Sequence, residues 1–285
     1  MKLDNLVEGI VIKRPSKLIK TPYVADILNI DTNEEVLAHS PSLGCCGLAD
    51  KTARILMGLS KSKTTKKNEN KLKCSHTIYL AIQSNEKTQN EVIVGIHPKL
   101  AEQLVENALT NNCLQKLLHI KSYKRETCVY IQDFVDSRFD FSGVDENGVP
   151  FLMEVKNVPL ADYEDIPSKE RNKMDFSDRE FNSKVAYFPD GYRKKTTDVV
   201  SPRALKHITE LTYIKTTSNT RCIMCYVIQR NDVNRFQVSI IDQQYREAVK
   251  NAIEKGVEII TMVVEWNRNG EAYFVTDNLP ITSFD

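Results

Sequence analysis

The sequence of 285 residues has few cysteines, no long apolar run and no excess of either charge. No apolar stretch approaches the roughly 20 residues that a membrane-spanning helix needs, and Met1–Gly9 lacks the charged-then-apolar order of a secretory signal. We therefore expect an intracellular, cytoplasmic protein (nuclear if the source is eukaryotic) with no membrane partner. The formal net charge of +1 does not by itself mark a nucleic-acid-binding protein.

The seven cysteines are an odd number in a chain without an export signal, which predicts reduced thiols. Cys222 and Cys225 have the spacing of redox or zinc sites, but they lie in an apolar, strand-like run and no second pair at that spacing exists. We interpret them as buried structural thiols. Cys45 and Cys46 are adjacent, a poor spacing for metal ligands, and receive no role.

Two local clusters of basic residues interrupt the balanced charge. One runs from Lys61 to Lys73 and the other from Arg193 to Lys206. A solvated loop and a phosphate-contacting loop are equally good interpretations of the first cluster.

The first part of the chain, residues 1–96, has the spacing of short strands with little helical periodicity. The expected strands are Gly9–Lys13, Tyr23–Ile30, Glu35–His39, Thr77–Gln83 and Val92–Ile96. This spacing predicts a small β-barrel. An OB-type barrel, a fold that commonly binds single strands, is one candidate among several small barrels.

Residues 97–285 alternate helical and strand patterns, which predicts an α/β domain with a mixed sheet. The expected elements are a helix through Leu100–Leu109, strands from Cys128 and from Pro150, an exposed charged insertion over Asp162–Lys184, a helix opened by Ser201-Pro202, a strand over Cys222–Ile228, a helix over Asp242–Lys255 that Gly256 ends, and strands over Val257–Trp266 and Glu271–Thr276. This is the element order of restriction-endonuclease-like nucleases.

A predicted hairpin carries the most informative residues of the chain. Strand alternation groups Phe139 and Phe141 with Phe151, Met153 and Val155 as a core face.

The opposite face of the same hairpin would then hold Asp140, Glu154 and Lys156. A three-residue loop with positive φ at Gly148 would set Asp140 directly across from Glu154. Two carboxylates at that distance repel each other unless a cation or a proton lies between them. The arrangement predicts a Mg²⁺ or Mn²⁺ site for phosphodiester hydrolysis.

Several motifs, in one order over about Arg14 to Val264, resemble the sugar fermentation stimulation protein family. They are Ser137-Arg138-Phe139-Asp140-Phe141, Glu154-Val155-Lys156-Asn157-Val158, Phe188-Pro189-Asp190, Lys206-His207 with Glu210-Leu211, Gln229-Arg230-Asn231-Asp232-Val233 and Gly256-Val257-Glu258. The resemblance implies an OB-like barrel joined to a nuclease-like domain of the PD-(D/E)XK type, and a DNA-binding protein. The chain departs from the family pattern in the lengthened Asp162–Lys184 segment and in Arg203-Ala204, where an arginine-glycine pair is usual.

For such a nuclease, the carboxylates of Asp140 and Glu154 and the main-chain carbonyl of Val155 would hold one or two hard divalent cations. Lys156 would orient the attacking water or stabilise the developing charge. A third carboxylate from the preceding helix often completes these sites. Glu106 is the first candidate and Glu126 the second, although a solvated helix residue is a slightly better interpretation of Glu106.

Basic residues near the site are candidates for nucleic-acid contact. Arg203, Lys206 and His207 would reach the phosphate backbone from their helix, whereas His207 taken alone is more typical of an ordinary half-exposed histidine. Arg138 would pair either with a neighbouring carboxylate or with a phosphate. Asp190 is better interpreted as a turn residue after Pro189 than as a metal ligand.

These observations predict a DNA-binding, Mg²⁺-dependent hydrolase of phosphodiester bonds. The alternative is a non-catalytic, DNA-binding regulatory protein on a nuclease-like scaffold. The sequence does not distinguish single-stranded from double-stranded DNA, leaves RNA open as a substrate, and does not define the oligomeric state.

Overall fold

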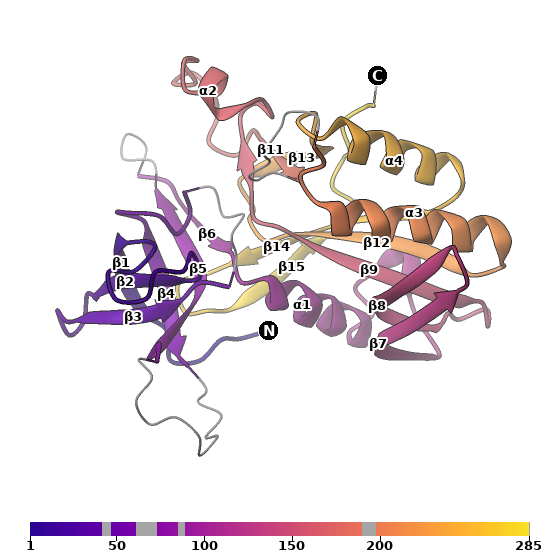
Figure 1. Cartoon of the computed structure of the whole chain (residues 1–285), viewed down its shortest axis with the longest axis horizontal. Coiled ribbons are helices and arrows are strands. Elements are labelled where there is room, and N and C mark those ends of the chain that lie inside the picture. The colour runs from indigo at the N-terminus through magenta and orange to yellow at the C-terminus, as the bar shows by residue number, and fades with distance from the viewer. Residues whose placement is uncertain (42–46, 61–72, 85–88, 190–197, 285) are drawn as a thin grey trace. The chain divides into compact units, whose positions relative to one another are not determined.

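The computed structural model describes all residues except 42–46, 61–72, 85–88, 190–197 and 285. The chain divides into two units (Figure 1). The first comprises Met1–Leu100 with Glu265–Tyr273, and the second comprises Ala101–Val264 with Phe274–Asp285. The sequence placed a boundary after residue 96 and did not predict that a late segment of the chain joins the first unit.

The first unit is built on a closed five-stranded barrel, as the strand spacing predicted. Its strands are β1 (Val7–Lys13), β2 (Val24–Asn29), β3 (Glu35–His39), β4 (Arg54–Leu59) and β5 (His76–Ser84), followed by β6 (Glu91–Gly95). The order is β3-β2-β1-β4-β5, and a parallel pairing of β3 with β5 closes the barrel, while β6 pairs with β5. Strand β4, which the sequence did not predict, lies between β1 and β5.

The second unit is an α/β unit with a mixed sheet, also as predicted. Its elements are α1 (Pro98–Thr110), a 3₁₀ turn at Gln115–Leu117, β7 (Ser122–Ile131), β8 (Val135–Val144), β9 (Pro150–Val158), β10 (Ala161–Asp162), α2 (Ser168–Arg171), β11 (Lys184–Phe188), α3 (Pro202–Thr217), β12 (Arg221–Ile228), β13 (Val233–Val238), α4 (Gln243–Glu254), β14 (Glu258–Trp266) and β15 (Ala272–Thr276). Residues at one end of α1, β14 and β15 belong to the first unit.

The main sheet of this unit runs β14-β12-β9-β8-β7. Strand β12 pairs in parallel with both β9 and β14, and it is a nearly continuous apolar run because helices cover such central parallel strands. Helices α3 and α4 pack against each other and cover one side of the strands (Figure 1). Strands β10, β11 and β13 form a second, small sheet.

Helix α3, which carries the predicted Lys206-His207 pair, begins as its sequence predicted. Pro202 is its first residue and the Ser201 hydroxyl accepts a hydrogen bond from the Ala204 amide at 3.4 Å. Helix α4 is capped in the same way by Asp242, and Gly256 follows its end with a φ of +89°.

Removal of the N-terminal cap of α3 is expected to lower the stability of the protein by a small but measurable amount. Ser201→Ala should lower the free energy of unfolding by about 1 kcal/mol, because the amide loses its acceptor. Thr209→Ala is the matched control, since this exposed mid-helix threonine only bonds its own helix. Urea unfolding followed by circular dichroism measures both, and equal effects of the two variants would contradict a capping role.

The Asp162–Lys184 segment is largely exposed, as predicted, but one residue of it is buried. Asp165 within it is 3% exposed. Its carboxylate accepts hydrogen bonds from the Gln237 side chain, the Ser239 hydroxyl and the Ile240 amide at 2.9 to 3.0 Å. A single aspartate thus anchors the segment to β13 and to the residues that follow it.

The two cysteines at CxxC spacing are completely buried, as predicted. Burial raises the pKa of both the Cys222 and the Cys225 thiols. Other predictions, namely those on Cys45-Cys46, Lys61 to Lys71, Asp190 and Arg193–Lys195, fall on residues outside the described part of the chain. None of the helices in the described part is long and apolar enough to cross a membrane.

Candidate metal-binding and nuclease-type site

The candidate site lies on the β8–β9 hairpin, whose geometry follows the sequence prediction. The strands pair in the register Phe141 to Met153, and the Asp145 amide bonds the Val149 carbonyl at 2.9 Å across the turn. Gly148 in that turn has a φ of +84°. The pairing ends at Phe141 and Met153, and the next positions of the same register are Asp140 and Glu154.

The core face of this hairpin is buried as predicted, with Phe139, Phe141, Phe151, Met153 and Val155 all at or below 8% exposure. The other face is buried at Glu154, where His207 of α3 contacts it, whereas Asp140 and Lys156 are partly exposed. Glu154, which alternation places on that second face, is only 2% exposed. The carboxylate is therefore inside the protein and must be stabilised there by specific partners.

Asp140 lies where the two strands separate. Its Oδ2 accepts a hydrogen bond from the Val155 amide at 2.7 Å, so that the aspartate takes the place of a strand partner. Burial and the charge of Glu154 raise the pKa of Asp140 to about 7, although the Val155 amide and the Lys156 charge oppose the shift. At neutral pH, Asp140 therefore lies close to its titration midpoint.

The pKa of Glu154 is shifted in the opposite direction to that of Asp140. Burial alone would raise its pKa, but hydrogen bonds and charges from His207 and Lys156 outweigh burial and hold the pKa of this carboxyl below its usual range. Both partners approach the same oxygen, Oε1. The second oxygen, Oε2, is buried and has no hydrogen-bond partner among the described residues.

A side chain of helix α3, His207, holds Glu154 and Lys156 in place. His207 is 4% exposed, its Nδ1 contacts Glu154, and Nδ1 lies 3.4 Å from the Lys156 Nζ. One turn later, Glu210 accepts a hydrogen bond from the Asp136 amide at 3.0 Å. The buried histidine is therefore a partner of Glu154, a contact over 53 residues that no local pattern in the sequence indicates.

The other predicted basic residues lie outside this buried cluster. Arg138 is exposed and its guanidinium is 3.4 Å from the carboxylate of Glu126, also exposed. Lys206 is half-exposed and donates to the Asp136 carbonyl. Arg203 is exposed on the same helix. These side chains are placed to contact a ligand outside the cluster and not to contact Glu154.

The predicted helix carboxylate, Glu106, is held in an ion pair. Arg125 of β7 donates to Glu106 at 2.8 Å and to Glu102 at 2.6 Å. The charge of Glu102 also makes a small contribution to the raised pKa of Asp140. Glu102 lies four residues before Glu106 and therefore on the same face of α1, and this spacing could have identified it from the sequence.

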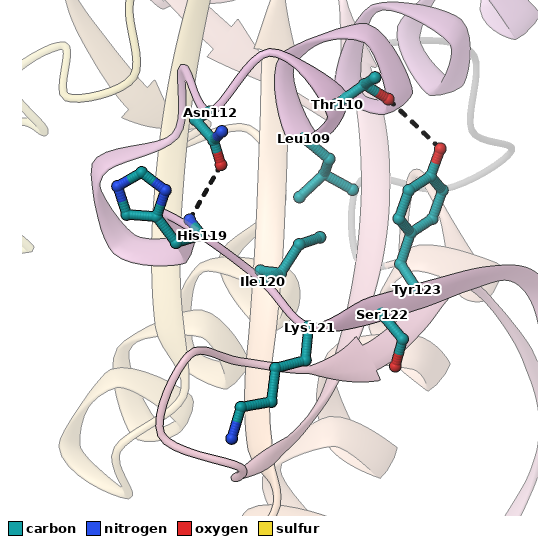
Figure 2. Close-up of a pocket in the computed structure, with 8 residues that line it drawn as sticks. All are labelled: Leu109, Thr110, Asn112, His119, Ile120, Lys121, Ser122 and Tyr123. Atoms are coloured by element: carbon teal, nitrogen blue, oxygen red, sulfur yellow. Dashed lines mark hydrogen bonds between the residues drawn. The ribbon is translucent and has the colours of Figure 1, made fainter.

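An open pocket in the same unit does not contain the candidate site. It lies between the end of α1 and the start of β7, where Tyr123 faces Thr110, and Lys121 extends away from both (Figure 2). Hydrogen bonds join Tyr123 to Thr110 at 3.3 Å and the His119 amide to Asn112 at 2.9 Å. Among the described residues, no group of three or more His, Cys, Asp or Glu side chains is close enough to hold a metal ion.

A closed five-stranded barrel followed by an α/β unit with this hairpin is a fold found in a solved structure. The structure of Pyrococcus furiosus SfsA in complex with Ca²⁺ has the same fold, with a TM-score of 0.71 over 99% of this chain and 98% of that chain at 18% identity. The match confirms the predicted fold class, an OB-like barrel followed by a restriction-endonuclease-like domain.

Sequence comparison identifies the family. The model of the sugar fermentation stimulation protein RE domain matches residues 99–171 and 176–270. A sugar fermentation stimulation protein homolog of Clostridium novyi is 28% identical over 263 residues, which cover 91% of this chain and 90% of that protein. A homolog from Alteromonas mediterranea is 29% identical over 262 residues, covering 90% and 89%. The chain belongs to the sugar fermentation stimulation protein family, as its motifs predicted.

Proposed function

We propose that this protein is a divalent-metal-dependent nuclease that hydrolyses phosphodiester bonds of DNA at Asp140, Glu154 and Lys156. One observation carries the proposal. The buried Oε2 of Glu154 has no hydrogen-bond partner among the described residues, and the Glu154 charge raises the pKa of the adjacent Asp140. A cation between the two carboxylates would give the Glu154 Oε2 a partner and would reduce the repulsion that raises the pKa of Asp140.

The residues present fit a hard divalent cation such as Mg²⁺ or Mn²⁺. The ligands would be the carboxylates of Asp140 and Glu154 and the carbonyl of Val155, all of them oxygens. Two carboxylates are enough, because Mg²⁺ retains several of its waters. The Ca²⁺ complex of the Pyrococcus furiosus relative supports this choice, since Ca²⁺ is also a hard cation that prefers oxygen ligands. When bound, the metal would lower the pKa of a water and offset phosphate charge.

The side chains around the ligands would have separate roles. Lys156, held against Glu154, would donate a hydrogen bond to the attacking water or to the scissile phosphate. His207 would keep one oxygen of Glu154 engaged, so that the other is directed to the cation. Arg138, Arg203 and Lys206, which are exposed, would contact the phosphate backbone. Glu102 would favour metal binding by adding negative charge beside Asp140.

Cleavage of labelled single- and double-stranded DNA tests the proposal directly. We expect cutting with Mg²⁺ or Mn²⁺, none with EDTA, and loss in both Asp140→Ala and Lys156→Ala. The matched control is Lys124→Ala, because this exposed lysine on β7 belongs to the same unit and lies outside the cluster. Cutting that persists in both site variants would point to a contaminating nuclease and would refute the assignment.

A non-catalytic DNA-binding protein on the same scaffold is the second candidate. It is favoured by one observation, that no group of three or more ligand-type side chains among the described residues is close enough to hold a metal. Lys156 and His207 would then simply neutralise a buried glutamate. Absence of cutting by the wild type, together with salt-sensitive DNA binding that survives both substitutions, would support this alternative.

A further inference from the structure

Four aromatic rings lie along one outer face of the barrel. His39 of β3 pairs in register with Thr77 of β5, and Tyr79 follows two residues later on the same side of that strand. Tyr23 stacks on His39 with ring centroids 6.4 Å apart, and Tyr79 stacks on His97 at 5.1 Å. We call Tyr23, His39, Tyr79 and His97 the ring row.

The ring row lies on the outer side of the barrel, exposed at Tyr23 and His39 and partly buried at Tyr79 and His97. The residues that alternate with it along the strands, Ala38, Ile78 and Leu80, are completely buried, so their neighbours point away from the barrel interior. Tyr23 is 40% exposed and His39 is exposed. Gly58 of β4 lies beneath Tyr79, since a Cβ there would come within 3.3 Å of the tyrosine ring. The glycine thus leaves room for the ring to lie flat on the strand.

The two histidines of the row act as neutral aromatic rings at physiological pH. Burial lowers the pKa of His39, and burial, the repulsion from His39 and the Lys99 charge lower that of His97 to about 4. The two stacked pairs are neighbours because His39 of β3 pairs with Thr77 of β5, two residues before Tyr79. In addition, the buried Nδ1 of His97 has no hydrogen-bond partner among the described residues.

The net charge of residues 1–100 differs in sign from that of residues 101–285. Residues 1–100 contain 15 Lys and Arg against 10 Asp and Glu, a net of +5. Because the whole chain has a net charge of +1, residues 101–285 have a net charge of −4. Residues 61–72, which lie outside the described part of the chain, carry +4 of this charge. A polyanion would therefore be attracted chiefly to that stretch of the sequence.

We propose that the ring row is a stacking platform for single-stranded DNA. Unpaired bases present faces that stack on aromatic side chains, whereas bases in a duplex are already stacked on each other. The positive charge of residues 1–100 would attract the sugar-phosphate chain. The proposal rests on the nucleic-acid substrate proposed above and specifies its form as a single strand.

The test measures binding without cleavage. Full-length Asp140→Ala protein in EDTA is titrated against fluorescein-labelled oligothymidylate, the same oligonucleotide paired with oligoadenylate, and oligouridylate. Three further variants on this background are compared: Tyr23→Leu with Tyr79→Leu, Tyr23→Phe with Tyr79→Phe, and Tyr273→Leu. Tyr273 is the control, since it is a 54% exposed tyrosine of the same unit outside the ring row.

We expect the leucine pair to weaken oligothymidylate binding by roughly tenfold per ring, and the phenylalanine pair and the control to bind like the parent protein. Parent-like binding by the leucine pair would overturn the platform. So would a preference of the parent for duplex or for oligouridylate. If the leucine pair does not fold, His39→Ala, an exposed change at the end of β3, replaces it with the same expectation for one ring.

The two proposals fail separately. A wild-type protein that does not cut DNA but binds oligothymidylate through the ring row would refute the nuclease and keep the platform. A protein that cuts DNA with metal, and whose leucine pair binds oligothymidylate like its parent, would refute only the platform.

Discussion

Asp140→Asn is expected to abolish metal-dependent cleavage and, in the absence of metal, to stabilise the protein at pH 8. The reason for both effects is the raised pKa of Asp140, which burial and the Glu154 charge bring from 3.8 to about 7. At pH 8 the wild-type carboxyl is ionised next to Glu154 with no cation to offset it. The amide of asparagine is neutral, and its oxygen can still accept from the Val155 amide, a bond of 2.7 Å in the wild type.

The sign of the pH dependence follows from linkage. An acid whose pKa is raised on folding contributes stability that is fully present below its unfolded pKa and lost as pH rises through the folded value. The wild type should therefore lose stability relative to Asp140→Asn between about pH 4 and pH 7. The difference in the free energy of unfolding at pH 8 should reach about 2 to 4 kcal/mol, since one pKa unit corresponds to 1.36 kcal/mol.

Urea unfolding in EDTA at pH 5, 6, 7 and 8 measures this difference. Added Mg²⁺ should raise the melting temperature of the wild type and leave that of Asp140→Asn nearly unchanged, because the variant lacks one of the two charged ligands. Asp136→Asn is the control, an exposed aspartate on the same strand. A stability gap that does not grow with pH would show that Asp140 is not held in a strained ionised state.

Arg230→Met is expected to cost about 3 to 5 kcal/mol of folding free energy, the usual loss when one partner of a buried ion pair is removed. Arg230 is 1% exposed and donates to both oxygens of Asp232 at 2.6 and 2.7 Å, and to the Pro159 carbonyl at 3.0 Å. Lys184 of β11 also donates to Asp232. Without Arg230, the aspartate would keep its charge in a nearly dry environment with one cation fewer.

This ion pair also bears on the candidate site. Arg230 follows β12 and bonds the residue directly after β9, the strand that carries Glu154 and Lys156. Urea unfolding of Arg230→Met, with Arg235→Met as the control, measures the cost. Arg235 is a partly exposed arginine on the adjacent β13, with a hydrogen bond to Asn234. A loss equal to that of the control would show that the buried pair contributes little.

The features that the sequence predicted correctly depend on residues close together in the chain. Ser201-Pro202 and Gly256 marked the ends of helices correctly because capping depends on residues a few positions apart. The turn at Gly148 determined the register of the hairpin for the same reason. By contrast, β4 and β13 lack a clear periodic pattern and were not predicted.

Local pattern also has a limit at the site itself. Strand alternation correctly identified which hairpin residues enter the core, but it could not show that the opposite face would be buried under α3. The sequence marked the helix Ser201–Leu211 and the Glu154 strand separately. Their contact, through His207, depends on how the helix packs on the sheet, and packing is determined by the whole core.

The sequence by itself therefore determined the two-part architecture, the turn and register of the β8–β9 hairpin, and the family to which the chain belongs. These follow from residue periods, turn residues and motif order, all of which act over short distances along the chain. Only the tertiary structure decided that Glu154 is buried with His207 and Lys156 on one oxygen. The same holds for the bonds of Arg230 to Pro159 after β9 and to Asp232 before β13, and for the two stacked ring pairs of the first unit. Each of these arrangements joins residues from distant segments of the chain. Core packing and barrel closure bring such segments together, and local sequence patterns do not specify this approach.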